Sequence, residues 1–276
     1  MFSRSIALLI LPLFSACSLC QMTPEQTREI IRRSAQATQA DWDRAPGFDF
    51  CELDKTKTGS RTSAVLMVEG SPYYRVVQAN GVDLSPALEA AEQKRLAATI
   101  QRRQRETSDE RAKRTAQYQK ERRGDRVLLE QLTEAMNFTF VGQEVVDSRS
   151  VDTFEATPRP GYVPKSMEMQ VLPGMKGKLW IDPTSFRWVK VQAEVVKPVS
   201  IAGFLARVEP GTRFELQERP INPSIWLPHH FIMQSRARIL FLIPKSSEAN
   251  ETYFNYKTNG TLSIDTCKSN DATNRP

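Results

Sequence analysis

Acid–base chemistry near neutral pH most often uses histidine, and this sequence holds only two, the adjacent His229 and His230. In a strand, neighbouring side chains point to opposite faces, so the pair cannot jointly hold one metal ion. A hydrolase would have to use one of them, yet no Gly-x-Ser-x-Gly elbow or phosphate-binding loop accompanies them. We interpret both as surface residues after a turn at residues 226–228. The sequence therefore predicts no enzyme, no metal site and no cofactor.

Cysteine is the next reactive residue type, and four are present. Cys17 and Cys20 lie in the N-terminal region discussed below, which leaves Cys51 and Cys267 near the two ends of the chain. In an oxidising compartment such an isolated pair can form a disulfide, and closing so long a loop is worth roughly 4–5 kcal/mol. The alternative is two free thiols that never meet. We favour the disulfide.

Residues 1–20 have the pattern of an export signal. Arg4 precedes a nine-residue apolar run, residues 6–14 (IALLILPLF), and small residues follow it. The run is shorter than the roughly 20 apolar residues that cross a bilayer. Cleavage near residues 18–20 would leave a soluble periplasmic protein. The stretch ending at Cys17 also resembles a lipobox, with Phe14 in place of the usual leucine, so lipidation of Cys17 and anchoring to the outer membrane is the alternative.

A strongly basic segment stands out in the middle of the chain. Residues 94–126 carry twelve basic against five acidic side chains, a local charge of +7 in a chain of net charge +6. We interpret it as an exposed helical arm, either simply solvated or in contact with anionic membrane lipids. Nucleic acid is not expected, because Tyr118 is the only aromatic residue there. The arginines assigned to membrane contact are Arg102, Arg103, Arg105, Arg114, Arg122 and Arg123.

Helices are predicted on both sides of a first group of strands. Thr23 and Pro24 mark the start of an amphipathic helix over residues 24–44. Residues 86–136 lack proline after Pro86 and are rich in helix formers, which predicts a helical insertion that breaks near Ser108 and Gly124. Short strands are expected at residues 48–53, 64–68 and 73–77.

From Asn137 onward the apolar period changes to two, which is typical of antiparallel strands with one face on a core. Examples are residues 138–140, 167–171, 189–195 and 213–217. The run ILFLI at residues 239–243 is apolar on both faces and predicts a central strand. Residues 21–266 are then a single domain, and the polar residues 267–276 are expected to be a disordered tail.

The fold class that follows is α+β, with a strongly curved antiparallel sheet packed on helices. A bent sheet around an amphipathic helix leaves an apolar cleft, which is the kind of site that binds acyl chains. Large or adaptable side chains suited to lining such a cleft are Met167, Met169, Trp180, Trp188 and Trp226. For any one of them, ordinary core packing is the alternative.

Three short motifs add a resemblance. Residues 158–162 (PRPGY), 177–182 (GKLWID) and 226–228 (WLP) occur in an order and spacing similar to a group of bacterial envelope proteins that resemble the LolA/LolB lipoprotein-carrier superfamily. The resemblance implies a half-open β-barrel with helices on its concave side, and a role as carrier or sensor of lipids or acylated proteins. The long basic insertion departs from the simple carriers.

Two functions remain. The leading hypothesis is an exported, non-catalytic protein that binds lipid or lipoprotein acyl chains in an apolar cavity. The alternative is a structural or scaffolding envelope protein with a fully packed core, which binds a protein partner through the basic arm. A hydrolase that uses His229 or His230 is the third and weakest hypothesis.

Overall fold

The computed structural model describes residues 22–201, 206–239 and 243–268. Its α-helices are α1 (Pro24–Arg44), α2 (Pro86–Gln104) and α3 (Ser108–Ala135), and its 3-10 helices are η1 (Ala45–Gly47), η2 (Glu168–Gly174) and η3 (Ile264–Cys267). The strands are β1 (Phe48–Thr56), β2 (Gly59–Val68), β3 (Ser71–Ala79), β4 (Val82–Asp83), β5 (Met136–Val146), β6 (Arg149–Pro158), β7 (Met175–Ile181), β8 (Trp188–Val195), β9 (Val199–Ile201), β10 (Ala206–Val208), β11 (Arg213–Asn222), β12 (Ile225–Ile239) and β13 (Ile243–Thr258).

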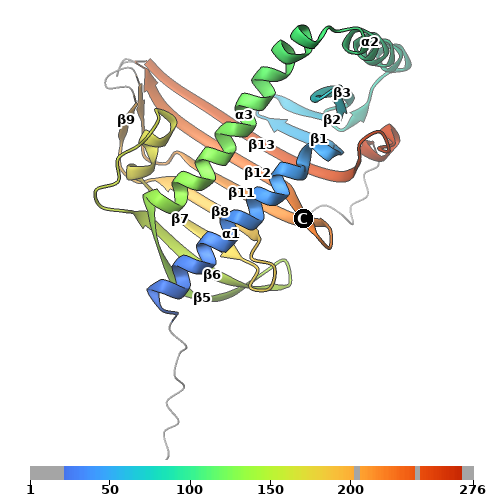
Figure 1. The fold of residues 1–276 in the computed structure, drawn as a ribbon. Coiled ribbons are helices and arrows are strands. Elements are labelled where there is room, and N and C mark those ends of the chain that lie inside the picture. Colours follow the sequence, from blue (N-terminus) through green and yellow to red (C-terminus); the bar gives the residue numbers. More distant parts are fainter. Residues whose placement is uncertain (1–21, 202–205, 240–242, 269–276) are drawn as a thin grey trace, which may run out of the picture.

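The strands form one open antiparallel sheet in the order β4-β3-β2-β1-β13-β12-β11-β8-β7-β6-β5, and β9 and β10 attach beside β12. Figure 1 shows α1 and α3 lying side by side across one face of this sheet. The predicted fold class, an antiparallel sheet packed on helices with a helical insertion, is confirmed. The two edge strands, β4 and β5, do not meet, so the sheet is not closed into a barrel.

Helix α1 has the bounds that the sequence predicts, and its capping box explains its start. The Thr23 hydroxyl accepts from the backbone N–H of Gln26, and the Gln26 side chain accepts from that of Thr23. Its buried residues recur every three or four positions, as one helical face requires: Thr27, Ile31, Ser34, Thr38 and Asp41.

The insertion forms two helices, α2 and α3, and the predicted break before Ser108 is confirmed. A capping box between Thr107 and Glu110 restarts the chain as α3. The second predicted break is wrong, because Gly124 lies inside α3. A mid-helix glycine costs only about 1 kcal/mol, and contacts on either side of Gly124, described below, tie this part of α3 to the end of α1.

Two strand predictions are wrong. The methionine-rich stretch around Met169 forms the 3-10 helix η2, in which Met169 and Leu172 are three residues apart and both buried. The apolar run at residues 239–243 is not one strand, because β12 ends at Ile239 and β13 begins at Ile243, its partner across a hairpin. Residues 240–242 lie outside the described part. An apolar run alone does not distinguish a strand from the approach to a turn.

The described structure includes the start of the predicted C-terminal tail but not the predicted signal. Cys267 and Lys268, which the sequence assigned to a disordered tail, belong to the fold, since η3 ends at Cys267 and that side chain is buried. The predicted signal, residues 1–20, its Cys17, and the rest of the tail lie outside the described residues. Among the helices that the structure describes, none is long and apolar enough to span a membrane.

Candidate ligand cavity and basic arm

The five side chains predicted to line an apolar cleft do not share one site. Trp188 and Met169 belong to the apolar clusters on the face of the sheet that the helices cover. Trp180 and Trp226 belong to a separate cluster on the opposite face, because Trp180 lies between Leu179 and Ile181 in a strand of period two. Met167 precedes η2 and is 55% exposed.

A small apolar cavity of about 50 Å³ does lie between the helices and the sheet. Its floor is a row of small residues, Ala156, Gly177 and Ala193, which are in register across β6, β7 and β8. Ala35 of α1 lines the same cavity from the helix side. Large residues border the row, among them Leu132, Met136, Phe138, Leu179, Trp188 and Phe214. The cavity exists because four small side chains meet where the two layers face each other.

Gly177 is the residue that the floor depends on most. A Cβ atom there would lie 2.8 Å from the carbonyl oxygen of Gln192, closer than packed atoms approach. The glycine therefore serves the close approach of β7 and β8, and it leaves the floor without a side chain. Trp188 borders the same space, and its Nε1 donates to the Ser34 hydroxyl at 3.2 Å.

A larger groove of about 1250 Å³ runs beside the N-terminal half of α1. Met22, Ile30 and Phe140 form its apolar part, and the rim includes Gln143 and Asp152. These three apolar side chains pack on the same cluster that contains Ile31, Leu179 and Trp188, which line the closed cavity. Groove and cavity share no lining residue, but both border this one apolar cluster beneath α1. We call the groove, the cavity and this cluster the apolar site.

The C-terminal end of α1 is fixed by polar contacts. Asp41 is fully buried, and its carboxylate accepts from Arg187, from Arg44 at 2.8 Å and from the Trp226 backbone N–H at 3.0 Å. In the described chain, residues 22–32 form hydrogen bonds only within their own helix or its cap. One end of α1 is therefore clamped, and the end beside the groove is held by apolar packing.

Glu218 adds a second contact at the clamped end. Its Oε1 accepts from the Trp42 indole N–H at 2.6 Å, and Oε2 has no hydrogen-bond partner within the described residues. Burial raises the pKa of Glu218 to about 8, the charge of Asp41 acts in the same direction, and the bond from Trp42 opposes them. At neutral pH the carboxyl is therefore largely protonated.

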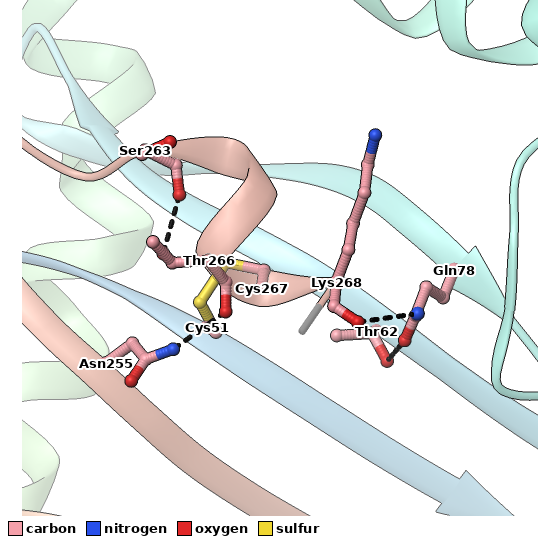
Figure 2. Close-up of a disulfide and its surroundings, with 8 residues drawn as sticks. All are labelled: Cys51, Thr62, Gln78, Asn255, Ser263, Thr266, Cys267 and Lys268. Atoms are coloured by element: carbon pink, nitrogen blue, oxygen red, sulfur yellow. Dashed lines mark hydrogen bonds between the residues drawn. A yellow bond between two sulfur atoms is a disulfide. The ribbon is translucent and has the colours of Figure 1, made fainter. Parts of the chain in front are cut away.

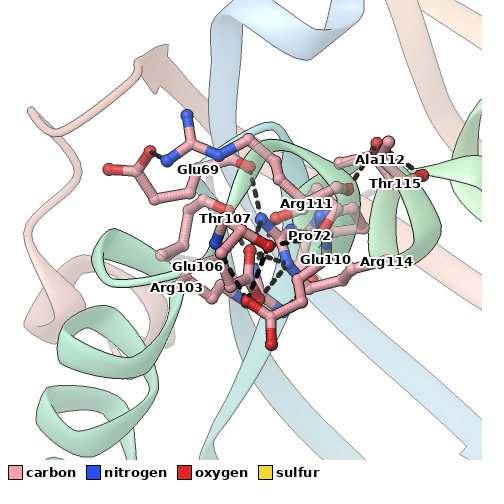
Figure 3. A network of polar contacts seen from close by, with 12 residues as sticks. Glu69, Pro72, Arg103, Glu106, Thr107, Glu110, Arg111, Ala112, Arg114 and Thr115 are labelled. Atoms are coloured by element: carbon pink, nitrogen blue, oxygen red, sulfur yellow. Dashed lines mark hydrogen bonds and ion pairs between the residues drawn. The ribbon is translucent and has the colours of Figure 1, made fainter.

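The basic arm divides into two sets of arginines, and Arg103 belongs to the inward set. Its side chain is buried, and Nη1 donates to the carbonyl oxygens of Val68 and Ser71, each at 2.9 Å. Nη2 donates to the carbonyl of Pro72 at 3.4 Å. Arg103 thus satisfies the carbonyls of the β2–β3 turn (Figure 3), and the predicted membrane role does not fit its position.

Arg114 also points inward, onto the same turn (Figure 3). It donates to Glu106 at 2.7 Å, to the Ser71 hydroxyl at 2.7 Å and to the Glu69 carbonyl at 2.9 Å. The hydrogen bond from Arg114 lowers the pKa of Glu106, against the effect of burial. Arg111 pairs with the Glu69 carboxylate at 3.1 Å. The network joins α2, α3 and the β2–β3 turn.

Further along α3, Arg122 completes the inward set. It donates to the Trp42 carbonyl at 2.8 Å, and Arg126 pairs with Asp43 at 2.8 Å, so this part of α3 is tied to the end of α1. These bonds flank Gly124. The other predicted arginines, Arg102, Arg105 and Arg123, are exposed and have no ion-pair or hydrogen-bond partner for their side chains in the described part of the chain.

Cys51 and Cys267 form a disulfide between β1 and η3 (Figure 2). Both are buried, at 0% and 2% exposed. The segment around them is tied to the sheet by Asn255, which donates to the Thr266 carbonyl at 2.8 Å, and by Gln78, which donates to that of Lys268 at 3.1 Å. The structure therefore brings this predicted pair together across 216 positions of sequence.

The histidines are placed differently from the sequence interpretation. Residues 226–228 lie within β12 instead of forming a turn, and His229 is buried, with Nδ1 3.1 Å from the Tyr253 carbonyl oxygen. Burial lowers the pKa of His229 to about 4. His230 Nε2 lies 3.2 Å from Asn250 Oδ1. Neither partner is a nucleophile. Across the described ranges, no group of three or more histidine, cysteine or acidic residues could hold a metal ion.

Sequence reasoning missed the small residues that create the cavity. No sequence pattern marks the four small residues of the cavity, Ala35, Ala156, Gly177 and Ala193, although Gly177 is the first residue of the GKLWID motif. Small residues at the inward positions of successive strands are the available signal. That signal becomes informative only when the strand register is known, because the register aligns the three residues of the sheet.

No protein-family model matches the chain, and no curated protein matches its sequence. A domain described as an outer membrane lipoprotein-sorting protein of Vibrio parahaemolyticus is 12% identical, with a TM-score of 0.34 over 92% of this chain and 100% of that chain. A DUF1329 family protein of Desulfovibrio piger is 10% identical, with a TM-score of 0.29 over 88% and 98%. A chain of the MucA/MucB complex of Pseudomonas aeruginosa is 10% identical, with a TM-score of 0.26 over 85% of this chain and 99% of that chain. Structural similarities this low carry no argument about function.

Proposed function

We propose that this chain is an exported, non-catalytic binding protein that holds an acyl chain of a lipid or lipoprotein in the apolar site beneath α1. The observation that carries the proposal is the apolar cluster that the groove and the cavity both border. The open groove bordered by Met22, Ile30 and Phe140 shares one apolar cluster with the closed cavity over Gly177. Each methylene that leaves water for such a site contributes about 0.8 kcal/mol.

Binding requires the closed part of the site to widen. A volume of about 50 Å³ does not hold a long chain, so the N-terminal half of α1 has to move away from the sheet. Residues 22–32 form no hydrogen bond to the sheet in the described chain, so opening there breaks apolar packing and the bond from Trp188 to Ser34, while Asp41 clamps the other end. Export is supported by the signal pattern of residues 1–20 and by the Cys51–Cys267 disulfide, a bond typical of oxidising compartments.

A cavity-filling variant tests the proposal. Ala35→Leu adds bulk inside the closed cavity, and Ala40→Leu adds the same bulk at an exposed position of the same helix. The purified, delipidated protein should take up a fluorescent fatty acid, and Ala35→Leu should weaken uptake at least tenfold. Ala40→Leu should bind as the wild type does. Failure of the wild type to bind any fatty acid, or equal binding by both variants, would refute the proposal.

A second candidate function is favoured by the small size of the closed cavity, which is close to an ordinary packing defect. In that case the chain is a scaffolding protein, and it meets a protein partner through the basic arm. A partner that co-purifies with the wild type and is lost on deletion of residues 94–126, while the lipid content stays unchanged, would support this function.

A further inference from the structure

The cations of the basic arm fall into a bound set and a free set. Arg95, Arg103, Arg111, Arg114, Arg122 and Arg126 are engaged by backbone carbonyls or by carboxylates. Six further cations are exposed and have no partner for their side chains anywhere in the described ranges: Lys94, Arg102, Arg105, Lys113, Lys120 and Arg123. These six cations favour the helix by their propensity, but their charge is not neutralised within the described chain and is available to a partner.

Three of the free cations share one face of α3. Lys113, Lys120 and Arg123 are seven and three residues apart, and Ala116 and Val127 continue the same stripe. On α3, the bound Arg111, Arg114 and Arg122 lie on the opposite side of the helix, and Arg126 lies at its flank, paired with Asp43. Asp109 at one end and Glu130 at the other bound the stripe, and no acidic residue falls on it between them. We call Lys113, Ala116, Lys120, Arg123 and Val127 the basic stripe.

We propose that the basic stripe is the surface by which this protein docks on an anionic lipid bilayer. The positive charge of the stripe complements anionic headgroups, and each basic residue near such a surface contributes about 1 kcal/mol to membrane binding. The stripe offers no aromatic side chain on which bases could stack, since Tyr118 sits beneath Arg122 at 5.8 Å. It also lacks the buried aromatic anchors of a protein interface. An anionic bilayer surface can bind the basic stripe without aromatic stacking and without aromatic anchors.

This inference goes beyond the acyl-chain site and does not depend on it. Docking would place the α2–α3 corner against headgroups, because the free Arg102 and Arg105 lie at the end of α2, just before α3 begins. Figure 1 shows α3 leaving this corner and crossing the sheet beside α1. The helix that docks is therefore the one that also roofs the apolar site.

Two triple variants with the same change in net charge test the stripe. The first is Lys113→Gln, Lys120→Gln and Arg123→Gln. The control is Lys55→Gln, Lys176→Gln and Lys257→Gln, three exposed lysines on separate strands with no ion-pair partner in the described chain. The mature protein is purified from cells, and its binding is measured by co-sedimentation with phosphatidylglycerol/phosphatidylcholine vesicles. Thermal unfolding checks that both variants fold.

The stripe variant should lose about 100-fold in partitioning, which is about 1 kcal/mol for each of three cations, and the control should lose less than fivefold. Adding about 0.5 M salt should abolish binding of the wild type to the vesicles, because it screens the charges. Ala35→Leu should still bind vesicles, which separates this outcome from failure of the acyl-chain site. Equal losses in the two triple variants, or equal binding to pure phosphatidylcholine, would overturn the proposal. So would a stripe variant that binds vesicles normally but loses a co-purifying protein.

Discussion

Two parts of the same sheet are covered in different ways. Over β5 to β8 and β11, here the cavity half, residues 22–32 of α1 and the end of α3 meet the sheet through apolar side chains and leave space above Gly177. The hydrogen bonds from α1 to this half lie at Ser34, Asp41 and Trp42. Around β1 to β3, here the braced half, a disulfide and the network of Arg103 and Arg114 hold the surrounding segments. Apolar contacts have no preferred direction and allow sliding, whereas hydrogen bonds and a covalent link fix geometry. This difference is why the proposed opening of α1 is placed beside the groove.

The largest effect is expected in the braced half. Replacing Cys51 and Cys267 by alanine should lower the free energy of unfolding by about 5 kcal/mol, because the unfolded chain regains the freedom of a very long loop. Urea unfolding of the variant and of the oxidised wild type measures the difference. Fatty-acid uptake by the folded variant should not change. If the variant loses fatty-acid uptake without urea, at a temperature where it stays folded, the two halves are not independent.

The clamp on α1 should give the next largest effect. Asp41→Ala leaves Arg187 without its buried partner, so the free energy of unfolding should fall by about 3–5 kcal/mol. Asp43→Ala, the matched control, removes exposed ion pairs and should cost less than about 1 kcal/mol. Denaturant unfolding compares them. If α1 moves as proposed, the Asp41 variant should also release bound fatty acid faster, and an unchanged release rate would contradict the clamp.

Arg103→Gln tests whether the arm is braced by its inward face. Loss of hydrogen bonds from a charged group to three turn carbonyls should cost about 2 kcal/mol. Arg102→Gln, its exposed neighbour, should stay within about 0.5 kcal/mol of the wild type. Hydrogen exchange at the amides of the β2–β3 turn should rise only in the first variant. Equal destabilisation by the two would mean that the division into bound and free cations is wrong.

The smallest effect is a dependence of stability on pH at the clamped end of α1. The pKa of Glu218 is about 8 in the fold and near 4.5 when unfolded. Between these values only the folded state keeps the proton, so stability falls as pH rises, by about 1 kcal/mol per unit. Glu218→Gln should flatten the unfolding free energy between pH 7 and 8. Glu52→Gln is the control, because the pKa of Glu52 is about 7 and its contribution fades above that value.

The sign of this effect can be checked against His229. Its pKa is lowered to about 4, so its contribution is complete above its ordinary value of 6.5 and is lost as the pH falls toward 4. Above pH 7 it adds no slope. A protein whose stability rises between pH 7 and 8 would contradict the assignment of a neutral Glu218 in the fold.

Local patterns predicted the fold well where the signal was local. The bounds of α1 follow from Thr23, Pro24 and a three-to-four spacing. The break near Ser108 was also predicted, although the capping box of Thr107 and Glu110 that starts α3 was not. The alternating residues of β8 and β11 gave strands as expected. The predictions failed where a partner decides the structure. Met169 alternates like a strand residue but pairs with no strand of the described sheet, and Ile243 faces a hairpin partner that the sequence does not reveal.

The sequence by itself determined the helices, the antiparallel strands, the basic arm and the one cysteine pair able to close the chain, because each depends on residue type and spacing. Tertiary structure alone decided which tryptophans face the helices, which arginines of the arm are bound, and where small residues coincide. Ala35, Ala156, Gly177 and Ala193 come together only through strand register and the position of α1 over the sheet. A cavity is a space that no single segment encodes, since it is what remains when distant segments have packed.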